Sequence, residues 1–472
     1  MSETVNAAGM AGSRAGAVGP KLLPSPGLGR AEVLLALAAF AVLCIAVLKS
    51  ASVPNLVEPD DFAYRTSIVA MTDGHLLTLS AAQVDAVSAQ LSRTPDGPGT
   101  LGPGGPPEQW AHLSDGTWIS EKDPGYPFLA APFQLLGLIR LAPLFYGALG
   151  CLGLFFGARR WLGRFGGAAA VGLFCSSGAA LLFAWRDYMP TFTDASLIAA
   201  GTGALLWTVL AAEVTARRRT CTGLAGFVAI EAAVFVRYTD VVVLACAVVA
   251  VLAARRLRSV KLPASALAWW LGSVAVFGVG VSAFDDVVYG GPLKSGYQPG
   301  EITFSLGAVW RNLRFMPSHL IEALPMLMLG LAALAWIIGR GVSLRHADGD
   351  PGTVARRDVC VGLALAASWA SSWGLYATYN WTAQPGLSTL QAVRFYVPAI
   401  GAISLLGAWL ATRLPRREPA AAVALVAAVA AMFGLGIWSY SDMIPPMSSG
   451  QHIIGHGPPP GGARRQLHGR GS

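Results

Sequence analysis

The sequence predicts an all-α polytopic membrane protein. Of its 472 residues, 54% are hydrophobic and only 13% are charged, and the mean hydropathy is +0.53. An average soluble domain is less apolar and about 25% charged. Apolar stretches long enough to cross about 30 Å of hydrocarbon recur along the chain. These observations point away from a soluble enzyme.

The net charge of +8 does not indicate nucleic-acid binding. The basic residues occur in short clusters between apolar stretches, as expected of residues that set membrane topology. No nucleic-acid-binding motif is present. The six cysteines lie inside or at the ends of apolar stretches, and the histidines lack zinc-ligand spacing. The sequence therefore predicts neither a disulfide framework nor a metal site.

The N-terminal part is expected to be a tail followed by a membrane anchor. Residues 1–30 are rich in Ala, Gly and Pro and lack apolar periodicity, so they are predicted to form a disordered cytoplasmic tail. Residues 31–48 are long enough to span a bilayer. More apolar stretches follow without a convincing cleavage site, so this first stretch is predicted to be a retained signal anchor.

A large polar loop, residues 50–136, follows the anchor. Within it, Ser80 and Gln83 form a capping-box pattern. An apolar stripe at helical spacing comes next and predicts a short helix on the membrane surface. Residues 93–109 are rich in Pro and Gly and are expected to be an irregular connector. The residues of the stripe are Val84, Val87 and Leu91.

The rest of the chain is dominated by apolar stretches. Together with the anchor they predict about eleven transmembrane helices. They cover residues 138–158, 166–184, 194–212, 222–236, 240–254, 263–284, 317–338, 358–377, 395–412 and 419–439. Residues 441–472 are expected to form a flexible C-terminal tail.

The charges predict which way the helices run. Basic clusters occur at every second connection and on the N-terminal tail, so these segments are expected in the cytoplasm. The other connections carry most of the acidic residues and are expected outside. An odd number of spans would place the C-terminal tail outside as well. If the short stretch 222–236 does not cross, that side changes. The basic clusters are Arg159/Arg160/Arg164, Arg217/Arg218/Arg219, Arg255/Arg256/Arg258/Lys261, Arg340/Arg345/Arg356/Arg357 and Arg413/Arg416/Arg417.

Several short motifs with charged or aromatic residues fall on the predicted outer side. Three carboxylates in four residues at the membrane edge are costly unless they are solvated, paired or used in chemistry. Acids at such a position are often only part of a solvated loop. The motifs are Glu58-Pro-Asp-Asp61, Lys122-Asp-Pro-Gly-Tyr-Pro127, Arg186-Asp-Tyr-Met-Pro-Thr-Phe-Thr-Asp194, Val236-Arg-Tyr-Thr-Asp240, Tyr289-Gly-Gly-Pro-Leu-Lys-Ser-Gly-Tyr297 and Arg394-Phe-Tyr-Val-Pro398.

In their order and common sidedness, these motifs resemble the GT-C membrane glycosyltransferases. They resemble in particular the family 39 type, which includes protein O-mannosyltransferases and the aminoarabinose transferase of lipid A. The resemblance covers residues 31–412 and implies a GT-C-like transmembrane domain over 31–440. It also implies transfer of a sugar from a polyprenyl-phosphate carrier to an acceptor on the extracytoplasmic side. The sugar and the acceptor stay open.

The resemblance assigns roles to individual residues. Inversion at the anomeric carbon needs a carboxylate that takes the proton of the acceptor hydroxyl, and Asp60 or Asp61 matches this base. Neighbours on a helix point about 100° apart, so only one of the two is expected to enter the cavity. Asp194 matches the second acid, which would hold the sugar. An Asp in the first turn of a span is also a good helix-start residue.

The departing lipid phosphate needs fixed cations. Lys122 matches the family's lysine, although Asp123 beside it departs from the commoner Lys-Pro pattern. Each cation has an alternative role as an interfacial base that meets lipid headgroups. Relatives mostly work without a metal ion, so no cofactor is expected besides the lipid-linked donor, and a divalent cation at the acids stays open. The substrate-binding candidates are Glu58, Lys122, Arg186, Asp187, Arg394 and Tyr396.

Other readings stay open. Asp285-Asp286 is an alternative catalytic pair, and Glu231 lies within a span, where a structural hydrogen bond is the simpler explanation. Asn380-Trp-Thr382 matches a glycosylation sequon. The competing functional class is a transporter or flippase that moves a lipid-linked substrate without chemistry, which would need polar groups through the bilayer midplane.

Overall fold

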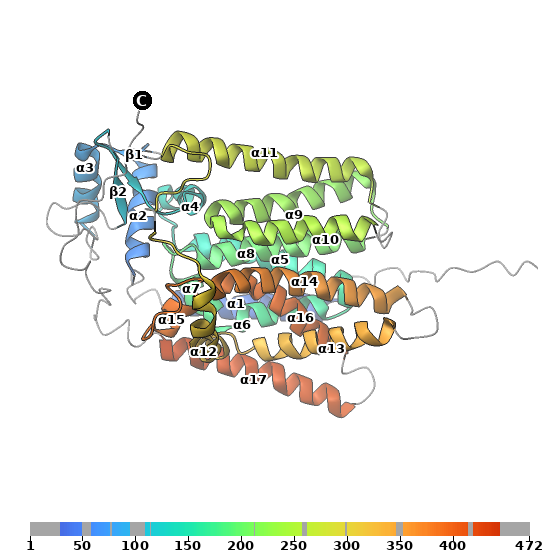
Figure 1. Cartoon of the computed structure of the whole chain (residues 1–472). Coiled ribbons are helices and arrows are strands. Elements are labelled where there is room, and N and C mark those ends of the chain that lie inside the picture. Colours follow the sequence, from blue (N-terminus) through green and yellow to red (C-terminus); the bar gives the residue numbers. More distant parts are fainter. Residues whose placement is uncertain are drawn as a thin grey trace, which may run out of the picture.

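A computed structural model describes residues 29–49, 58–75, 78–94, 109–113, 115–211, 213–256, 262–297, 300–345, 353–413 and 419–443. Long antiparallel helices form a bundle (Figure 1). The helices along the bundle are α1 (Arg30–Lys49), α5 (Leu141–Leu162), α6 (Gly166–Ser176), α7 (Gly178–Trp185), α8 (Thr191–Leu210), α9 (Ala216–Val236), α10 (Val241–Arg256), α11 (Ala264–Tyr289), α13 (Leu327–Arg345), α14 (Thr353–Ala377), α16 (Ile400–Arg413) and α17 (Pro419–Met443).

The helices confirm a multi-pass membrane protein. Among the described residues, seven helices are long and apolar enough to cross a membrane, and up to nine spans result if each of two bent pairs counts as one. Helix α9 is 21 residues long and meets this test, so the weak stretch 222–236 belongs to a full-length helix. The predicted total of about eleven spans stays a prediction.

The predicted span 317–338 is not one straight helix in the structure. Helix α12 (Leu306–Ala323) lies across the bundle, and α13 starts at Leu327 after a bend of 110°. Pro325 lies in the break, where its missing N–H and its ring stop a helix from continuing. Only α13 therefore runs along the bundle in this region.

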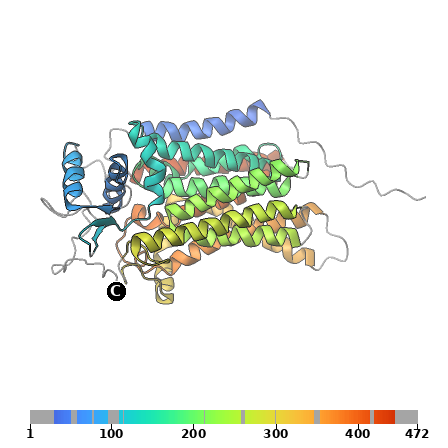
Figure 2. The same cartoon turned by 90° about the horizontal axis from the view of Figure 1, so that it is seen from above.

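A small lobe covers one end of the bundle (Figures 1 and 2). Two helices and three short antiparallel strands build it, in the strand order β1-β3-β2. The apolar side chains of α3 pack against α2 and the sheet, together with Leu79 and Trp110. The elements are α2 (Pro59–Thr72), α3 (Ala81–Leu91), β1 (Thr78–Leu79), β2 (Trp110–His112) and β3 (Trp118–Ser120).

The capping box that starts α3 is confirmed. The backbone N–H of Ser80 donates to Gln83 Oε1 over 2.7 Å, and Ser80 Oγ accepts from the Gln83 N–H over 3.4 Å. The stripe Val84, Val87 and Leu91 is buried in the core of the lobe. The expectation that this stripe faces the membrane surface is therefore wrong. The sequence pattern identifies an apolar face but not the surface that covers it.

Two short helices lie at the lobe end of the bundle. Helix α4 (Gly125–Leu135) leads from β3 into α5, and α15 (Thr389–Val393) precedes α16.

Most of the expected connector 93–109 lies outside the described residues, as do the expected tails up to residue 28 and from residue 444. Helix α17 extends to Met443, so the predicted boundary at 441 falls within a helix.

Small residues bring α5 and α8 close together, and this contact positions the first turn of α8. A Cβ at Gly153 would lie 2.6 Å from the backbone of Ala200, and one at Gly157 would lie 2.5 Å from the Gly203 carbonyl oxygen. Small residues at such spacing allow two membrane helices to approach by their backbones. Asp194, in the first turn of α8, is held next to the lobe end by this packing.

Candidate active site

The three acids of the first motif form the start of α2. Glu58 is the N-cap, Pro59 occupies the first helical position, where proline is favoured, and Asp61 is the third helical residue. The N–H of Glu58 donates to Asp61 Oδ2 over 2.9 Å. Acids in the first turn also interact well with the positive end of the helix dipole. Part of this motif is thus a helix-start signal, and Asp61 has a structural task.

Asp60 is held between two cations from distant parts of the chain. Lys122 Nζ lies 3.0 Å from Asp60 Oδ1, and Arg394 Nη1 lies 2.9 Å from Asp60 Oδ2. Burial alone would raise the pKa of Asp60, but Arg394 and Lys122 hold this pKa well below its ordinary value. The carboxyl group is therefore ionised in this arrangement.

Arg186 pairs with the other two acids. Its Nη2 lies 3.3 Å from Glu58 Oε2 and also donates to Asp61 Oδ2, and the side chains of Arg186 and Asp61 are fully buried. Arg394 Nη1 lies 2.5 Å from Glu58 Oε2. We call the six side chains that meet here the ion-pair cluster: Glu58, Asp60, Asp61, Lys122, Arg186 and Arg394.

Charge in the ion-pair cluster is balanced, but not all its donors are used. Three carboxylates face three cations. Among the described residues, Arg186 Nε and Nη1 and Arg394 Nε are buried without a hydrogen-bond partner. Buried N–H groups normally find partners. These guanidinium N–H groups are donors that an oxygen-rich ligand would satisfy.

Two glycines allow Lys122 to reach this position. A Cβ at Gly125 would lie 2.3 Å from the Phe235 carbonyl group, so glycine lets the start of α4 touch the end of α9. A Cβ at Gly296 would lie 2.6 Å from Glu121 Cα, so the 290–297 loop also lies against this segment. Tyr297 from that loop accepts a hydrogen bond from Lys122 Nζ over 3.1 Å.

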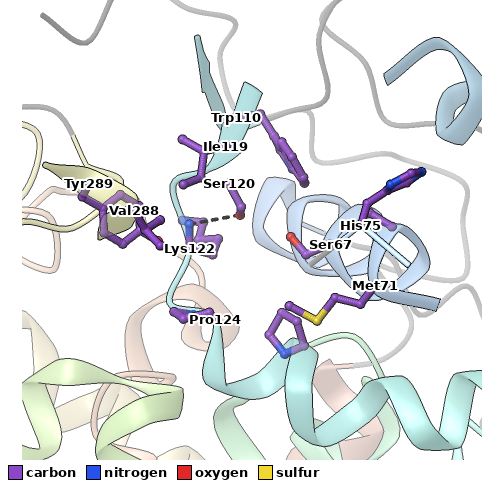
Figure 3. Close-up of a pocket in the computed structure, with 12 residues that line it drawn as sticks. Ser67, Met71, His75, Trp110, Ile119, Ser120, Lys122, Pro124, Val288 and Tyr289 are labelled. Atoms are coloured by element: carbon purple, nitrogen blue, oxygen red, sulfur yellow. Dashed lines mark hydrogen bonds between the residues drawn. The ribbon is translucent and has the colours of Figure 1, made fainter. Parts of the chain in front are cut away.

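A pocket adjoins Lys122 between α2, β3 and the end of α11. Trp110, Lys122 and Tyr289 are among its lining residues, and Ser120 Oγ accepts from the Lys122 backbone N–H over 3.1 Å (Figure 3). Lys122 thus lines this pocket and also contacts Asp60. A molecule that entered the pocket would approach the ion-pair cluster beside Lys122.

Asp194 belongs to a second, adjoining group. It is fully buried, and its Oδ2 lies 3.5 Å from Arg237 Nε. Asp240 interacts electrostatically with both of these residues. We call Asp194, Arg237 and Asp240 the Asp194 group. Arg237 Nη1 donates to the backbone carbonyl of Arg394 over 3.3 Å. This bond connects the Asp194 group to the ion-pair cluster.

Two predicted site residues point elsewhere. Asp187 Oδ2 lies 4.0 Å from Arg140 Nε. The Tyr396 ring packs edge-to-face on Trp373, with ring centroids 5.4 Å apart, and the Tyr396 carbonyl accepts from Trp373 Nε1. The structure therefore brings together Glu58, Asp60, Asp61, Lys122, Arg186 and Arg394 and connects Asp194 to them. Asp187 is close enough to Asp61 to interact with it electrostatically, whereas the Tyr396 ring packs against other aromatic residues.

The alternative acids occupy other surroundings. Asp285 Oδ1 accepts from Tyr238 OH over 2.9 Å, whereas its neighbour Asp286 is exposed. Glu231 accepts from Ser273 Oγ over 2.9 Å, which is the structural hydrogen bond that the sequence favours. The amide of Asn380 bonds to Ser305 and Thr303 at 2.8 Å each. These bonds occupy the amide that a glycan would need.

Asp123 gives a prediction about pH. Burial raises the pKa of Asp123 from 3.8 to about 7, although the Tyr238 N–H donates to its Oδ2 over 3.3 Å. The folded protein therefore holds this proton more tightly than the unfolded chain does. As a result, the contribution of Asp123 to the free energy of unfolding falls as the pH rises from about 4 to about 7. The melting-temperature gain of Asp123→Asn over the unmodified protein should be larger at pH 8 than at pH 5.

Thermal unfolding in detergent, followed by tryptophan fluorescence, measures this difference. Asp286→Asn is the matched control because this carboxyl is exposed on the neighbouring α11. A gain for Asp123→Asn that stays constant with pH would contradict the effect of burial. The control variant should show no growing difference.

Sequence reasoning missed the roles of Arg237 and Asp240. The motif that contains them is visible, but no task follows from it. The feature that could have identified them is the short connection in which they lie. Only a three-residue turn, η2 (Tyr238–Asp240), stands between the end of α9 and the start of α10. Charges in so short a turn between two spans have little room to be solvated, and such residues are functional candidates by default.

Comparison with solved structures defines the fold class. ArnT from Cupriavidus metallidurans in the apo state matches with a TM-score of 0.52 and 15% identity, over 84% of this chain and 62% of that chain. The same protein bound to undecaprenyl phosphate matches with a TM-score of 0.51 and 16% identity, over 87% of this chain and 65% of that chain. The apo form of the oligosaccharyltransferase from Archaeoglobus fulgidus matches with a TM-score of 0.50 and 12% identity, over 86% of this chain and 56% of that chain.

The chain therefore has the GT-C glycosyltransferase fold, and the predicted fold resemblance is confirmed. It spans between 56% and 65% of the length of these proteins. No protein-family model matches the chain, and no curated protein sequence does. At this level of identity the likeness defines the fold, and residue roles have to be argued from the site itself.

Proposed function

We propose that this protein is an inverting glycosyltransferase that moves a sugar from a polyprenyl-phosphate carrier to an acceptor hydroxyl. The observation that carries the proposal is the position of Asp60 between Lys122 and Arg394. A carboxylate and two cations are the groups that the reaction requires. The solved structure of ArnT bound to undecaprenyl phosphate, which has a similar fold, supports the choice of donor class.

Lys122 and Arg394 would bind the departing phosphate. Arg394 offers a planar guanidinium whose Nε has no hydrogen-bond partner among the described residues, so it has a donor for a phosphate oxygen. Lys122 offers a compact charge that Tyr297 holds in place. Cations fixed before the sugar leaves stabilise the charge that develops on the leaving oxygen.

Asp60 would be the base, in preference to Asp61. Asp61 is fully buried and is already engaged by Arg186 and by the Glu58 N–H. Asp60 has 15% of its side chain exposed, so an acceptor can reach it. When the carrier phosphate binds Lys122 and Arg394, it competes with Asp60 for them. The pKa of Asp60 then rises, and the carboxylate becomes a stronger base only when the donor is present.

The Asp194 group would hold the polar groups of the sugar. Asp194 is tied to Arg237, and Arg237 in turn contacts the backbone of Arg394. A sugar bound at Asp194 would therefore have its phosphate close to Arg394. Inversion requires the acceptor to attack the anomeric carbon on the face opposite the leaving phosphate, so Asp60 has to separate from Lys122 and Arg394 when these two cations bind the phosphate.

The reaction is expected on the extracytoplasmic side. The lobe and the ion-pair cluster lie at one end of the bundle, and α5, α10 and α16 carry basic residues in their last turns at the other end (Figure 1). The positive-inside rule assigns basic ends to the cytoplasm. The N-terminus would then be cytoplasmic as well.

The test is release of the lipid product. Purified protein in detergent is incubated with undecaprenyl-phosphate sugars of several kinds, each with a radiolabelled lipid, and with saccharide, peptide and lipid acceptors. Free undecaprenyl phosphate that appears only with an acceptor supports the proposal. A transporter or flippase would release none, and an absence of release with every donor and acceptor pair would contradict sugar transfer.

A further inference from the structure

Helix α12 has three distinct faces. Successive residues advance by about 100° around a helix axis, so residues three or four apart share a face. One face is buried against the protein, a second is apolar yet exposed, and a third is polar and exposed. These faces comprise, in that order, Ala308, Asn312, Met316, Leu320 and Ala323; Leu306, Trp310, Leu313, Pro317 and Ile321; and Arg311, Arg314 and Ser318.

The exposed apolar face is too large for a water-facing surface. Trp310 is 75% exposed and Leu313 is 59% exposed, and both lie on the same side of the helix. Contiguous exposed apolar surface of this kind marks contact with another protein or with a membrane. Arg311 and Arg314 border this face, and long basic side chains at such a border reach lipid headgroups.

The direction of α12 fits a membrane surface. It lies across the bundle at the end that carries the lobe (Figures 1 and 2), and it meets α13, which runs along the bundle, at a bend of 110°. A helix with one apolar and one basic face, perpendicular to the spans, lies in the interface between acyl chains and headgroups. A helix sunk into the hydrocarbon would leave its arginines unsolvated.

We infer that α12 is an interfacial helix whose partner is the lipid surface. Its apolar face rests in the acyl chains, and Arg311 and Arg314 lie among the headgroup phosphates. The inference does not depend on sugar transfer.

Contacts from α12 connect this lipid surface to the site. A ring nitrogen of His319 lies 2.8 Å from Thr389 Oγ1, and Thr389 Oγ1 donates to Glu322 Oε2 over 2.8 Å. Thr389 is the first residue of α15, and Arg394 is the residue that caps the end of α15. These bonds therefore connect α12 to the helix whose C-terminal end is capped by Arg394.

Cysteine labelling at two exposed positions tests the inference. Leu313→Cys probes the apolar face, and Ser318→Cys probes the polar face five residues further on. Both native side chains are exposed, so burial in the protein cannot cause a difference between them. The variants are placed in lipid nanodiscs that each hold one copy and are treated with N-ethylmaleimide. Peptide mass spectrometry reads each cysteine separately, so the native cysteines stay in place.

The cysteine at 318 should react about tenfold faster or more than the cysteine at 313, because the reactive thiolate forms poorly in an apolar medium. Trp310→Cys gives a second apolar-face position in case one variant does not fold. Equal rates after denaturation in SDS show that the thiols are equally reactive. Fast labelling at both faces would mean that the lipid does not cover the apolar face of α12 in a single copy of the protein. Slow labelling at both would mean a re-entrant helix, and either result overturns the inference.

Discussion

Replacing Asp60 with Asn should lower the rate of sugar transfer by about 10²- to 10⁴-fold, the usual contribution of a general base. The amide keeps the size of the carboxylate but cannot accept the proton of the acceptor hydroxyl. Lys122 and Arg394 retain an oxygen to contact, so the donor should still bind. The measurement is a kinetic assay of polyprenyl-phosphate release, with KM and kcat determined separately for the donor.

The expected change lies in kcat, with a modest change in the donor KM. Asp286→Asn is the matched control, because Asp286 is an exposed acid near the end of α11. It should leave both constants unchanged. Normal turnover by Asp60→Asn, with loss of activity in Asp286→Asn, would transfer the role of base to the alternative acidic pair. Gel filtration and thermal unfolding of both variants show whether they are folded.

The choice between Asp60 and Asp61 illustrates what the sequence contains. Helical geometry predicts that only one of two neighbours enters a cavity. The sequence does not say which, because the answer depends on Arg186, Arg394 and Lys122, which are far away along the chain. In the structure, Arg186 engages Asp61 while Arg394 and Lys122 engage Asp60. Local patterns thus predict the motif, and tertiary contacts divide its tasks.

The fold shows a similar division. Apolar length predicts the helices well, because a membrane span needs about 20 apolar residues wherever it lies. The sequence assigns the C-terminal part of α12 to a span because apolar residues such as Pro317 and Ile321 occur both on the apolar face of a surface helix and within a span. The sheet of the lobe was missed because its strands contain only two or three residues each. Such strands are too short to show an alternating pattern.

Replacing Arg186 with Met should lower the free energy of unfolding by about 3–5 kcal/mol, the typical cost of breaking a buried ion pair by removing one partner. The variant leaves the fully buried Asp61 carboxylate without its arginine, and Glu58 keeps only Arg394 of its two cations. Methionine fills most of the volume, so lost packing contributes little. Thermal unfolding in detergent should show a clear fall in the melting temperature.

A double variant separates the electrostatic cause from a simple packing defect. Adding Asp61→Asn to Arg186→Met removes the buried charge, so the double variant should be more stable than Arg186→Met alone. A packing defect would make it equally stable or worse. Arg140→Gln is the surface control, because Arg140 is 49% exposed and lies 4.0 Å from Asp187. Its effect should stay below about 1 kcal/mol. If Arg186→Met melts like the unmodified protein, the ion pairs of Arg186 do not stabilise the fold. The pairing of Arg186 with Asp61 then gives no reason to prefer Asp60 over Asp61 as the base.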